Sequence, residues 1–157
     1  MIFGMSVAHE EIKLCDSLNV SFSLTLFSDQ ENTFGVTIRT NSNTQWDFLG
    51  FFISMVEQKR LVPGNYLVVD NATEHHGSDS WSALRSLLTT VGIHLLFLPK
   101  YSPEFNPCEL VFAAMKNWIR AHRSTTQPLW VVILSALAQV LFAEVLAFYW
   151  KCTRHHF

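Results

Sequence analysis

The sequence predicts an α/β domain in which helices pack on the faces of a β-sheet. Short apolar runs bounded by turn residues indicate the strands, and longer segments with apolar residues at helical spacing indicate the helices. These segments follow one another in the order β-β-α-β-α-β-α-α. No Gly/Ser/Pro-rich linker, charge block or internal repeat interrupts the 157 residues, so we expect a single domain.

The first half of the chain contains two expected strands and one expected helix. In residues 20–27 larger apolar side chains alternate with smaller or polar ones, as in a strand with one buried face. A polar turn separates this strand from a second one at residues 33–40, and a helix is expected from Thr44 to Arg60. Apolar residues recur at helical spacing in that helix, and three phenylalanines widen its apolar face. The recurring residues are Trp46, Leu49, Ile53 and Val56, and the phenylalanines are Phe48, Phe51 and Phe52.

The second half alternates between strands and helices. Residues 66–69 form an unbroken apolar run followed by Asp70, which is typical of a strand covered on both faces. The pattern then predicts, in order, a helix at 79–91, a strand at 93–99, a helix from Pro107 to about Arg123 and an apolar helix at 129–150.

Composition limits the class of protein. Apolar residues make up 49% of the chain and charged residues 15%, which is a globular composition and excludes a disordered chain. The formal net charge of −2 does not indicate a nucleic-acid-binding module, because such modules are usually basic. The three cysteines are far apart and form no CxxC pair, so we expect neither a disulfide framework nor a zinc site. The first residues lack a basic leader with a long apolar core, and we expect a nuclear or cytoplasmic protein that is not secreted.

Residues 129–150 leave one alternative open. The segment is about as long as one membrane span, and Gln139 and Glu144 are its strongly polar side chains. Trp130 and Tyr149 lie near its ends, where a spanning helix carries interfacial aromatic residues. Because an acid well inside a span is costly, we expect a buried helix of the domain and keep a membrane-anchored protein as an alternative.

Asp70 is the first candidate for chemistry, since it directly follows a buried strand. Ligands of open α/β sheets bind beyond the carboxyl ends of the strands, where a carboxylate can hold a divalent cation. The alternative is that Asp70 and Asn71 simply open a turn, which both residue types favour.

Glu109 is the second candidate. Asn106 can cap a helix whose first residue is Pro107, and Glu109 is then the third helical residue. An acid at this position also suits a capping interaction and the helix dipole, and this is the structural alternative.

Several cations follow Glu109 on one face of the same helix. One acid near a sheet end, with cations running away from it, suits a metal ion together with a phosphate backbone. A solvated helix face is the alternative. The cations on this face are Lys116, Arg120 and Arg123.

Two longer motifs lead to a family. The segments LVVDNATEHH and LLFLPKYSPEFNPCELVFAAMKNWIR resemble the catalytic core of the DDE transposases of the Tc/mariner superfamily. The resemblance covers residues 20–123 and extends weakly to the last helix. The matching residues are Asp70, Asn71, His75, Pro99, Tyr101, Ser102, Pro103, Asn106, Pro107, Glu109 and Lys116.

The resemblance implies an RNase H-like fold, a mixed sheet flanked by helices, and Mg²⁺- or Mn²⁺-dependent DNA cleavage and transfer. In the family two ions are held by three carboxylates, and Asp70 and Glu109 would supply two of these as catalytic and metal-binding residues. DNA is the implied partner, a homodimer is left open, and no small-molecule cofactor is expected. The implied DNA-binding residues are Lys100, Lys116, Arg120 and Arg123.

One departure from the family pattern concerns the first carboxylate. The family's first Asp lies on the first strand of the sheet, and no apolar strand ending in Asp precedes residue 20. We therefore expect a poorly matched segment at 1–19 and a partial catalytic domain at 20–157 that lacks the first strand. Two carboxylates hold two ions poorly, so we expect little or no activity. A domesticated, non-catalytic DNA- or protein-binding domain is the main alternative.

Overall fold

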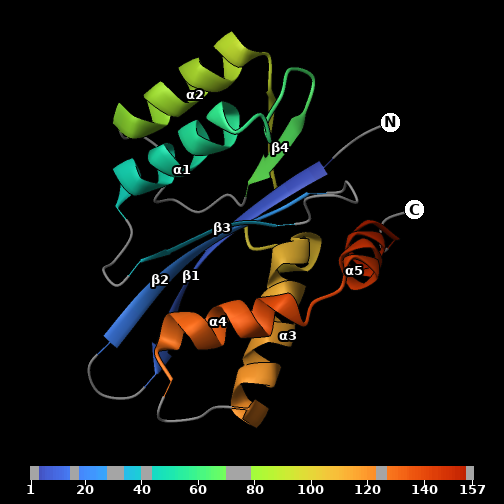
Figure 1. Cartoon of the computed structure of the whole chain (residues 1–157). Helices are drawn as coiled ribbons and strands as arrows, with labels where there is room; N and C mark the ends of the chain where they lie inside the picture. The colour runs from blue at the N-terminus through green and yellow to red at the C-terminus, as the bar shows by residue number, and fades with distance from the viewer. Residues whose placement is uncertain are drawn as a thin grey trace.

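A computed structural model shows a five-stranded sheet with helices on both faces (Figure 1). The structure describes residues 4–14, 18–27, 34–39, 44–69, 79–122 and 127–154. Within this part of the chain, residues 4–14 and 18–23 are described by their backbone alone.

The sheet is mixed, with the strand order β3-β2-β1-β4-β5. β1 (Gly4–Leu14), β2 (Leu18–Leu26) and β3 (Phe34–Arg39) form an antiparallel meander. β4 (Tyr66–Val69) and β5 (His94–Phe97) complete the sheet, with β4 parallel to β1 and β5 parallel to β4. The carboxyl ends of these three parallel strands therefore point toward the same edge of the sheet, where ligands of such folds bind.

The structure contains the first strand that the chain was expected to lack, so that expectation was wrong. β1 lies in the centre of the sheet, although its residues fall within the segment 1–19 that was expected to match poorly. Its register places Val7 opposite Val69 of β4 and Ala8 opposite Leu24 of β2. Two acids interrupt the apolar pattern of β1 and glutamate disfavours strands, but pairing on both sides outweighs this local preference.

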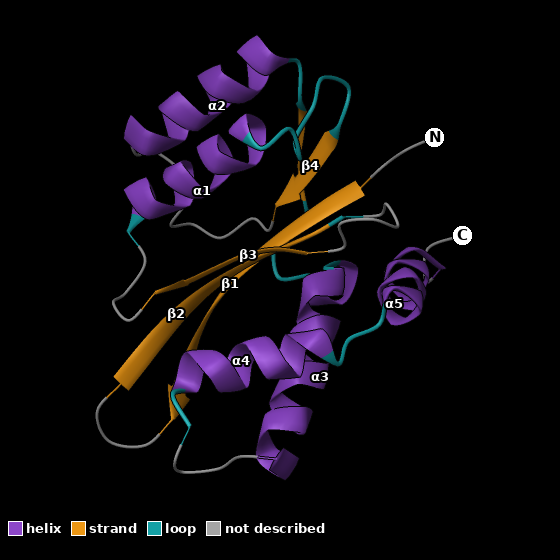
Figure 2. Cartoon of the chain, in the orientation of Figure 1, coloured by secondary structure: helices purple, strands orange, loops and turns teal. Residues whose placement is uncertain are grey.

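Helices cover the two faces of the sheet in two groups (Figure 2). α1 (Gln45–Glu57) and α2 (Asp79–Val91) lie on one face. α3 (Pro107–His122), α4 (Leu129–Ala138) and α5 (Phe142–Arg154) lie on the other. This layering is the α/β arrangement that the order of apolar segments predicts.

Each face of the sheet has its own apolar core. Leu67 and Val69 of β4 are buried in a cluster with residues of α1 and α2. Leu24 and Leu26 of β2 are buried in a second cluster with residues of α3, α4 and α5. Helices therefore cover both faces of the sheet, although Tyr66 and Val68 of β4 are only half-buried, whereas a strand covered on both faces was expected.

α1 begins at a capping box. The Thr44 hydroxyl accepts a hydrogen bond from the Asp47 N–H at 3.2 Å, and the Asp47 carboxylate accepts one from the Thr44 N–H at 2.9 Å. Of the expected apolar face, Leu49, Phe51 and Phe52 are buried, whereas Trp46 and Ile53 are 55% and 38% exposed. These two residues lie about two turns apart on one side of the helix, and the buried face points away from that side. Its buried residues are Leu49, Phe51, Phe52 and Met55.

The apolar segment 129–150 forms two helices rather than the single helix expected. α4 ends at Ala138, α5 begins at Phe142, and the two helices are bent by 79° relative to each other. The Leu141 N–H donates to the Glu144 carboxylate at 2.8 Å, which satisfies a free donor at the start of α5. Among the described residues no single helix is long and apolar enough to cross a membrane, although the bent pair together has the length and composition of a span.

Candidate functional site

The end of β4 marks the position of the first predicted carboxylate. β4 ends at Val69, whose carbonyl oxygen accepts a hydrogen bond from the Leu98 N–H at 2.9 Å, so the chain leaving β5 is held beside the end of β4. Asp70, Asn71 and His75 follow Val69 in the sequence and lie outside the described residues. The structure thus describes the strand that directly precedes Asp70 in the sequence.

The start of α3 carries the second predicted carboxylate. Asn106 is 2% exposed, and its side-chain oxygen accepts a hydrogen bond from the Cys108 N–H at 3.1 Å. Pro107 is the first helical residue, which confirms the predicted cap and helix start. Glu109 is exposed in the first turn of the helix, and its N–H donates to the Asn106 carbonyl oxygen at 3.1 Å.

A contact between α3 and β2 places this helix start over the sheet. The Cys108 sulfur lies 4.0 Å from the Leu24 carbonyl oxygen. Leu24 pairs with Ala8 of β1, and the preceding residue, Val7, pairs with Val69 of β4. Two strand spacings of about 4.8 Å therefore separate Leu24 from the end of β4. The first turn of α3 therefore covers the sheet at the level where β4 ends. Measured across the strands, this turn lies about 10 Å from the end of β4.

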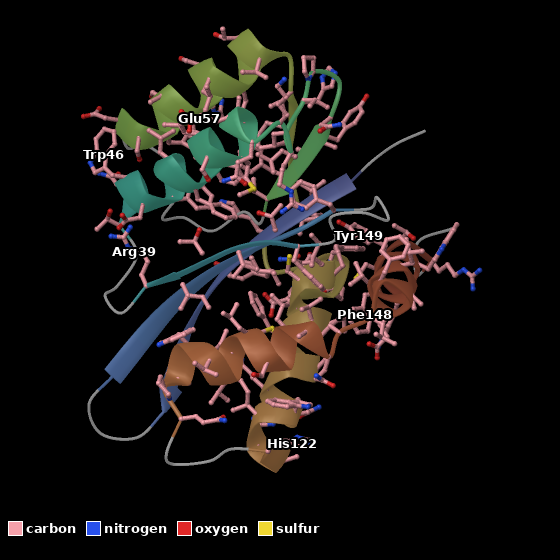
Figure 3. The ribbon with its side chains drawn as sticks, viewed as in Figure 1. Arg39, Trp46, Glu57, His122, Phe148 and Tyr149 are labelled. Carbon is pink, nitrogen blue, oxygen red and sulfur yellow. The ribbon has the colours of Figure 1, made fainter. Side chains whose placement is uncertain are left out.

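The predicted DNA-binding cations lie on α3 and on the turn before it. Lys100 is exposed just after β5, and Arg120 is exposed in the last turns of α3, where its guanidinium donates to the Asn117 side-chain oxygen at 3.1 Å. Lys116 is half-buried one turn earlier, and Arg123 lies outside the described residues. Figure 3 shows the end of α3, marked by His122, projecting away from the sheet. The described cations are therefore spread from the end of β5 to the last turns of α3.

The turn between β5 and α3 has an unusual backbone. Tyr101 has φ of 57°, in the left-handed region that L-residues rarely adopt, and its side chain is 98% exposed. The Ser102 hydroxyl donates to the Lys100 carbonyl oxygen at 3.2 Å, which helps to order the turn. The other predicted motif residues in this turn are Pro99, which is exposed, Ser102, which is half-buried, and Pro103, which is exposed and begins the 3₁₀ turn η2 (Pro103–Phe105).

β1 adds acids that the sequence reasoning missed. The acids of this central strand are Glu10 and Glu11, and Glu10 pairs in register with Phe22 of β2. The expected first carboxylate was an Asp at the end of an apolar strand, whereas the acids of β1 are glutamates within the strand. The alternation of Met5 with Val7 is the signal that could have indicated a strand before residue 20.

The acids of this region suit a hard divalent cation. Mg²⁺ and Mn²⁺ prefer oxygen ligands, and the residues at the predicted positions are carboxylic acids rather than histidine or cysteine. Glu109 is exposed on the first turn of α3 and is therefore accessible to an ion. In the part of the chain that the structure describes, no group of three His, Cys, Asp or Glu side chains is gathered closely enough to hold a metal.

Comparisons with known proteins indicate the family of this chain. A family model described as DDE superfamily endonuclease matches residues 5–128, which include all of β1 except Gly4. A comparison of the sequence with curated proteins found no match.

Solved structures similar to this chain include several of one transposase. The catalytic domain of Mos1 mariner transposase has a TM-score of 0.67 and 14% identity, over 97% of this chain and 81% of that one. The same catalytic domain with raltegravir and Mg has a TM-score of 0.66 and 12% identity, over 97% of this chain and 82% of that one. The pre-cleavage Mos1 transpososome has a TM-score of 0.63 and 13% identity, over 98% of this chain and 55% of that one. These likenesses confirm the expected RNase H-like fold.

Proposed function

The chain belongs to the DDE superfamily endonuclease family, and on that premise we propose that it cleaves and transfers DNA strands as the catalytic domain of a mariner-type transposase. The observation that carries the proposal is the placement of α3. Its first turn, with Glu109, covers the sheet at the level where β4 ends and Asp70 follows. We propose that Asp70 and Glu109, which are far apart in the sequence, come together in this region, because β4 leads into Asp70 and the first turn of α3 carries Glu109.

In the proposed mechanism Asp70 and Glu109 would hold divalent ions through their carboxylate oxygens. Bound Mg²⁺ or Mn²⁺ would supply Lewis acidity for an in-line phosphoryl transfer. The rigid parts of the chain position these acids: the buried strand β4 precedes Asp70, and the Asn106 cap fixes the helix turn that carries Glu109. Such fixed placement matters because a metal cluster tolerates little displacement of its ligands.

We further propose Glu10 as the first carboxylate. The proposal rests on backbone register, since the side chains of β1 are outside what the structure describes. Positions 8 and 10 share one phase of the strand, and Ala8 pairs with Leu24, which is buried on the face that α3 covers. Glu11 has the opposite phase. A glutamate at the position of the family's first Asp is longer by one methylene, which predicts weak rather than absent activity.

DNA is the proposed partner, and the exposed cations Lys100 and Arg120 are its proposed phosphate contacts. Both flank the proposed carboxylate site along the chain, one before α3 and one near its end. The relatives support this partner, since one matched structure is a Mos1 transpososome. A homodimer stays a prediction, which light scattering of the purified protein with and without DNA would check.

Nicking of supercoiled plasmid with Mg²⁺ or Mn²⁺ tests the proposal. We expect slow nicking that Glu109→Gln abolishes, because the amide removes the charge that holds the ion. Glu57→Gln is the control, since Glu57 is exposed at the end of α1 on the opposite face of the sheet. Metal-dependent nicking that survives Glu109→Gln would disprove the assignment of this residue.

A second variant tests the role of Glu10. We expect Glu10→Asp to raise the nicking rate about tenfold or more, because it restores the shorter carboxylate, while Glu11→Asp leaves the rate unchanged. If Glu10→Asp is no faster than the parent protein, Glu10 is not the first carboxylate. DNA binding without nicking in every one of these variants would favour the non-catalytic binding domain.

A further inference from the structure

Tyr101 is the most exposed large apolar side chain that the structure describes, and its backbone adopts a conformation that L-residues avoid. The ring is 98% exposed, and φ is 57°. The left-handed conformation brings Cβ close to the following carbonyl group, so glycine would adopt it at a lower cost. The ring gains nothing from burial either. Neither feature of this residue stabilises the domain on its own.

A second residue with positive φ provides a contrast. Lys59 has φ of 55° and follows α1, where the Arg60 N–H donates to the Met55 carbonyl oxygen at 2.9 Å. A left-handed residue at this position ends the helix and satisfies its last carbonyl groups, so the conformation of Lys59 has a structural reason. Tyr101 ends no helix, and a different reason is needed for an aromatic residue there.

The turn holds Tyr101 in place although the ring makes no packing contact that would bury it. Pro99 and Pro103 bracket the turn and fix their own φ angles. The Ser102 hydroxyl donates to the Lys100 carbonyl oxygen at 3.2 Å, and the Asn106 N–H donates to the Pro103 carbonyl oxygen at 2.9 Å. The ring is thus presented to solvent from an ordered turn, which lowers the entropy that a binding partner would have to remove.

The turn lies beside the proposed carboxylate site. Leu98 is hydrogen-bonded to the carbonyl oxygen of Val69 at 2.9 Å, and Tyr101 is three residues further along. Three residues span at most about 11 Å, so Tyr101 lies within that distance of the residue bonded to the end of β4. The same turn leads directly into α3 and Glu109. Tyr101 is therefore placed between the two elements that carry the proposed catalytic acids.

We propose that Tyr101 stacks on a nucleobase next to the phosphate that is cleaved, and so positions the DNA strand at the carboxylates. This inference rests on the proposed function. An exposed aromatic ring binds the face of a base whatever its sequence, and the neighbouring Lys100 offers a charge for the adjoining phosphate. A paired base inside a duplex has no free face. The ligand is therefore a base at a strand end, or one turned out of the stack.

Fluorescence of 2-aminopurine tests the proposal. The probe base is placed at the 3′ end of a single-stranded oligonucleotide, and at the centre of a blunt duplex of the same sequence as the comparison. We expect the full chain to quench the terminal probe, and Tyr101→Ala to weaken binding about tenfold and to abolish the quenching. Tyr101→Trp should retain both properties because it keeps an aromatic face. Equal binding and quenching by Tyr101→Ala would overturn the inference.

A matched pair of glycine variants separates stacking from folding. Tyr101→Gly and Lys59→Gly both relieve a left-handed backbone, and we expect neither to lower Tm. Only Tyr101→Gly should weaken binding of the oligonucleotide. If Tyr101→Gly lowers Tm by several degrees, the tyrosine has a structural role and the inference is wrong.

The outcome also distinguishes this inference from the proposed function. Suppose that nicking depends on Glu109, and that Tyr101→Ala leaves the Kd and KM for DNA unchanged. This result would refute the stacking role alone. Tyr101-dependent binding without any metal-dependent nicking would refute the proposed cleavage and leave the stacking role standing.

Discussion

The Tyr149 hydroxyl donates a hydrogen bond to the Leu26 carbonyl oxygen at 3.0 Å, so the last helix is joined to the last residue of β2. Figure 3 shows Tyr149 on α5, on the side of the helix that is nearer the sheet. We predict that Tyr149→Phe lowers the free energy of unfolding by about 1 kcal/mol, the usual net value of one such bond. Urea denaturation measures this, and Tyr101→Phe, whose ring is exposed, should leave the unfolding energy unchanged.

The capping box of α1 gives a second prediction. Thr44→Ala removes the side-chain oxygen that accepts from the Asp47 N–H, and we expect a loss of about 1 kcal/mol in the free energy of unfolding. Thr44→Ser keeps the oxygen and should restore most of this energy. Equal losses in both variants would show that the methyl group, not the cap, stabilises the helix.

The same box predicts a pH dependence. Hydrogen bonds from the Thr44 N–H and hydroxyl, and then the nearby Arg39 guanidinium, hold the pKa of Asp47 below its ordinary value of 3.8. A lowered folded-state pKa stabilises the protein above the unfolded value, and this contribution is lost as the pH falls through the folded value. Asp47→Asn should therefore destabilise the domain at pH 7, and the difference from the parent protein should shrink below about pH 4. Unfolding followed at a series of pH values would reveal a constant difference if the interaction did not involve the charge.

Two glycines predict opposite effects of the same substitution. A Cβ at Gly35 of β3 would lie 3.0 Å from the Met55 sulfur and 3.3 Å from a ring carbon of Phe27, so Gly35→Ala should cost about 1–3 kcal/mol. A Cβ at Gly50 of α1 meets no atom within 4 Å, so Gly50→Ala should stabilise the helix by about 0.5–1 kcal/mol. Thermal unfolding of the two variants checks whether each is more or less stable than the parent protein. A more stable Gly35→Ala variant would mean that α1 moves away from the sheet easily.

The charge on α3 predicts how DNA binding depends on salt. Arg120→Ala should weaken binding to every DNA sequence similarly and reduce the slope of log K against log salt concentration by about one, as loss of one phosphate contact does. Lys151→Ala, which removes an exposed cation of α5, is the control. An unchanged slope in Arg120→Ala would remove this residue from the DNA interface.

Much of the fold follows from local patterns in the sequence. α2 spans Asp79–Val91 as predicted, because Trp81, Leu84 and Leu88 recur at helical spacing and are all buried. The helix ends where expected, since Gly92 adopts φ of 82° directly after it. The apolar periodicity and the terminating glycine predict the same helix, and the tertiary packing of α2 is consistent with both.

Other elements depend on contacts that periodicity does not contain. The acids of β1 obscure its pattern, and only the neighbouring strands on both sides make it a strand. The bend between α4 and α5 lies in a segment that is apolar throughout, so composition predicts one helix. Packing decides instead, since Val140 is buried at the bend and Glu144 caps the new helix.

Part of the candidate site could also be predicted from local sequence, and part depends on contacts between distant segments. Asn106, Pro107 and Glu109 could be placed from the sequence, because a cap, a first-turn proline and a first-turn acid form one local signal. Which strand lies beside Val69, the residue before Asp70, could not be read from local residues. That relationship arises from parallel pairing between β1 and β4, which are far apart in the sequence.

The central place of β1 has a consequence for how the chain acquires its structure during synthesis. β1, β2 and β3 leave the ribosome before β4 and can pair as a meander through short loops, which is the rapid part of assembly. The opposite edge of β1 stays unpaired until β4 has been translated, and an open strand edge can capture another nascent chain. Slow translation between β3 and β4 should therefore increase aggregation more than an equal delay after β5.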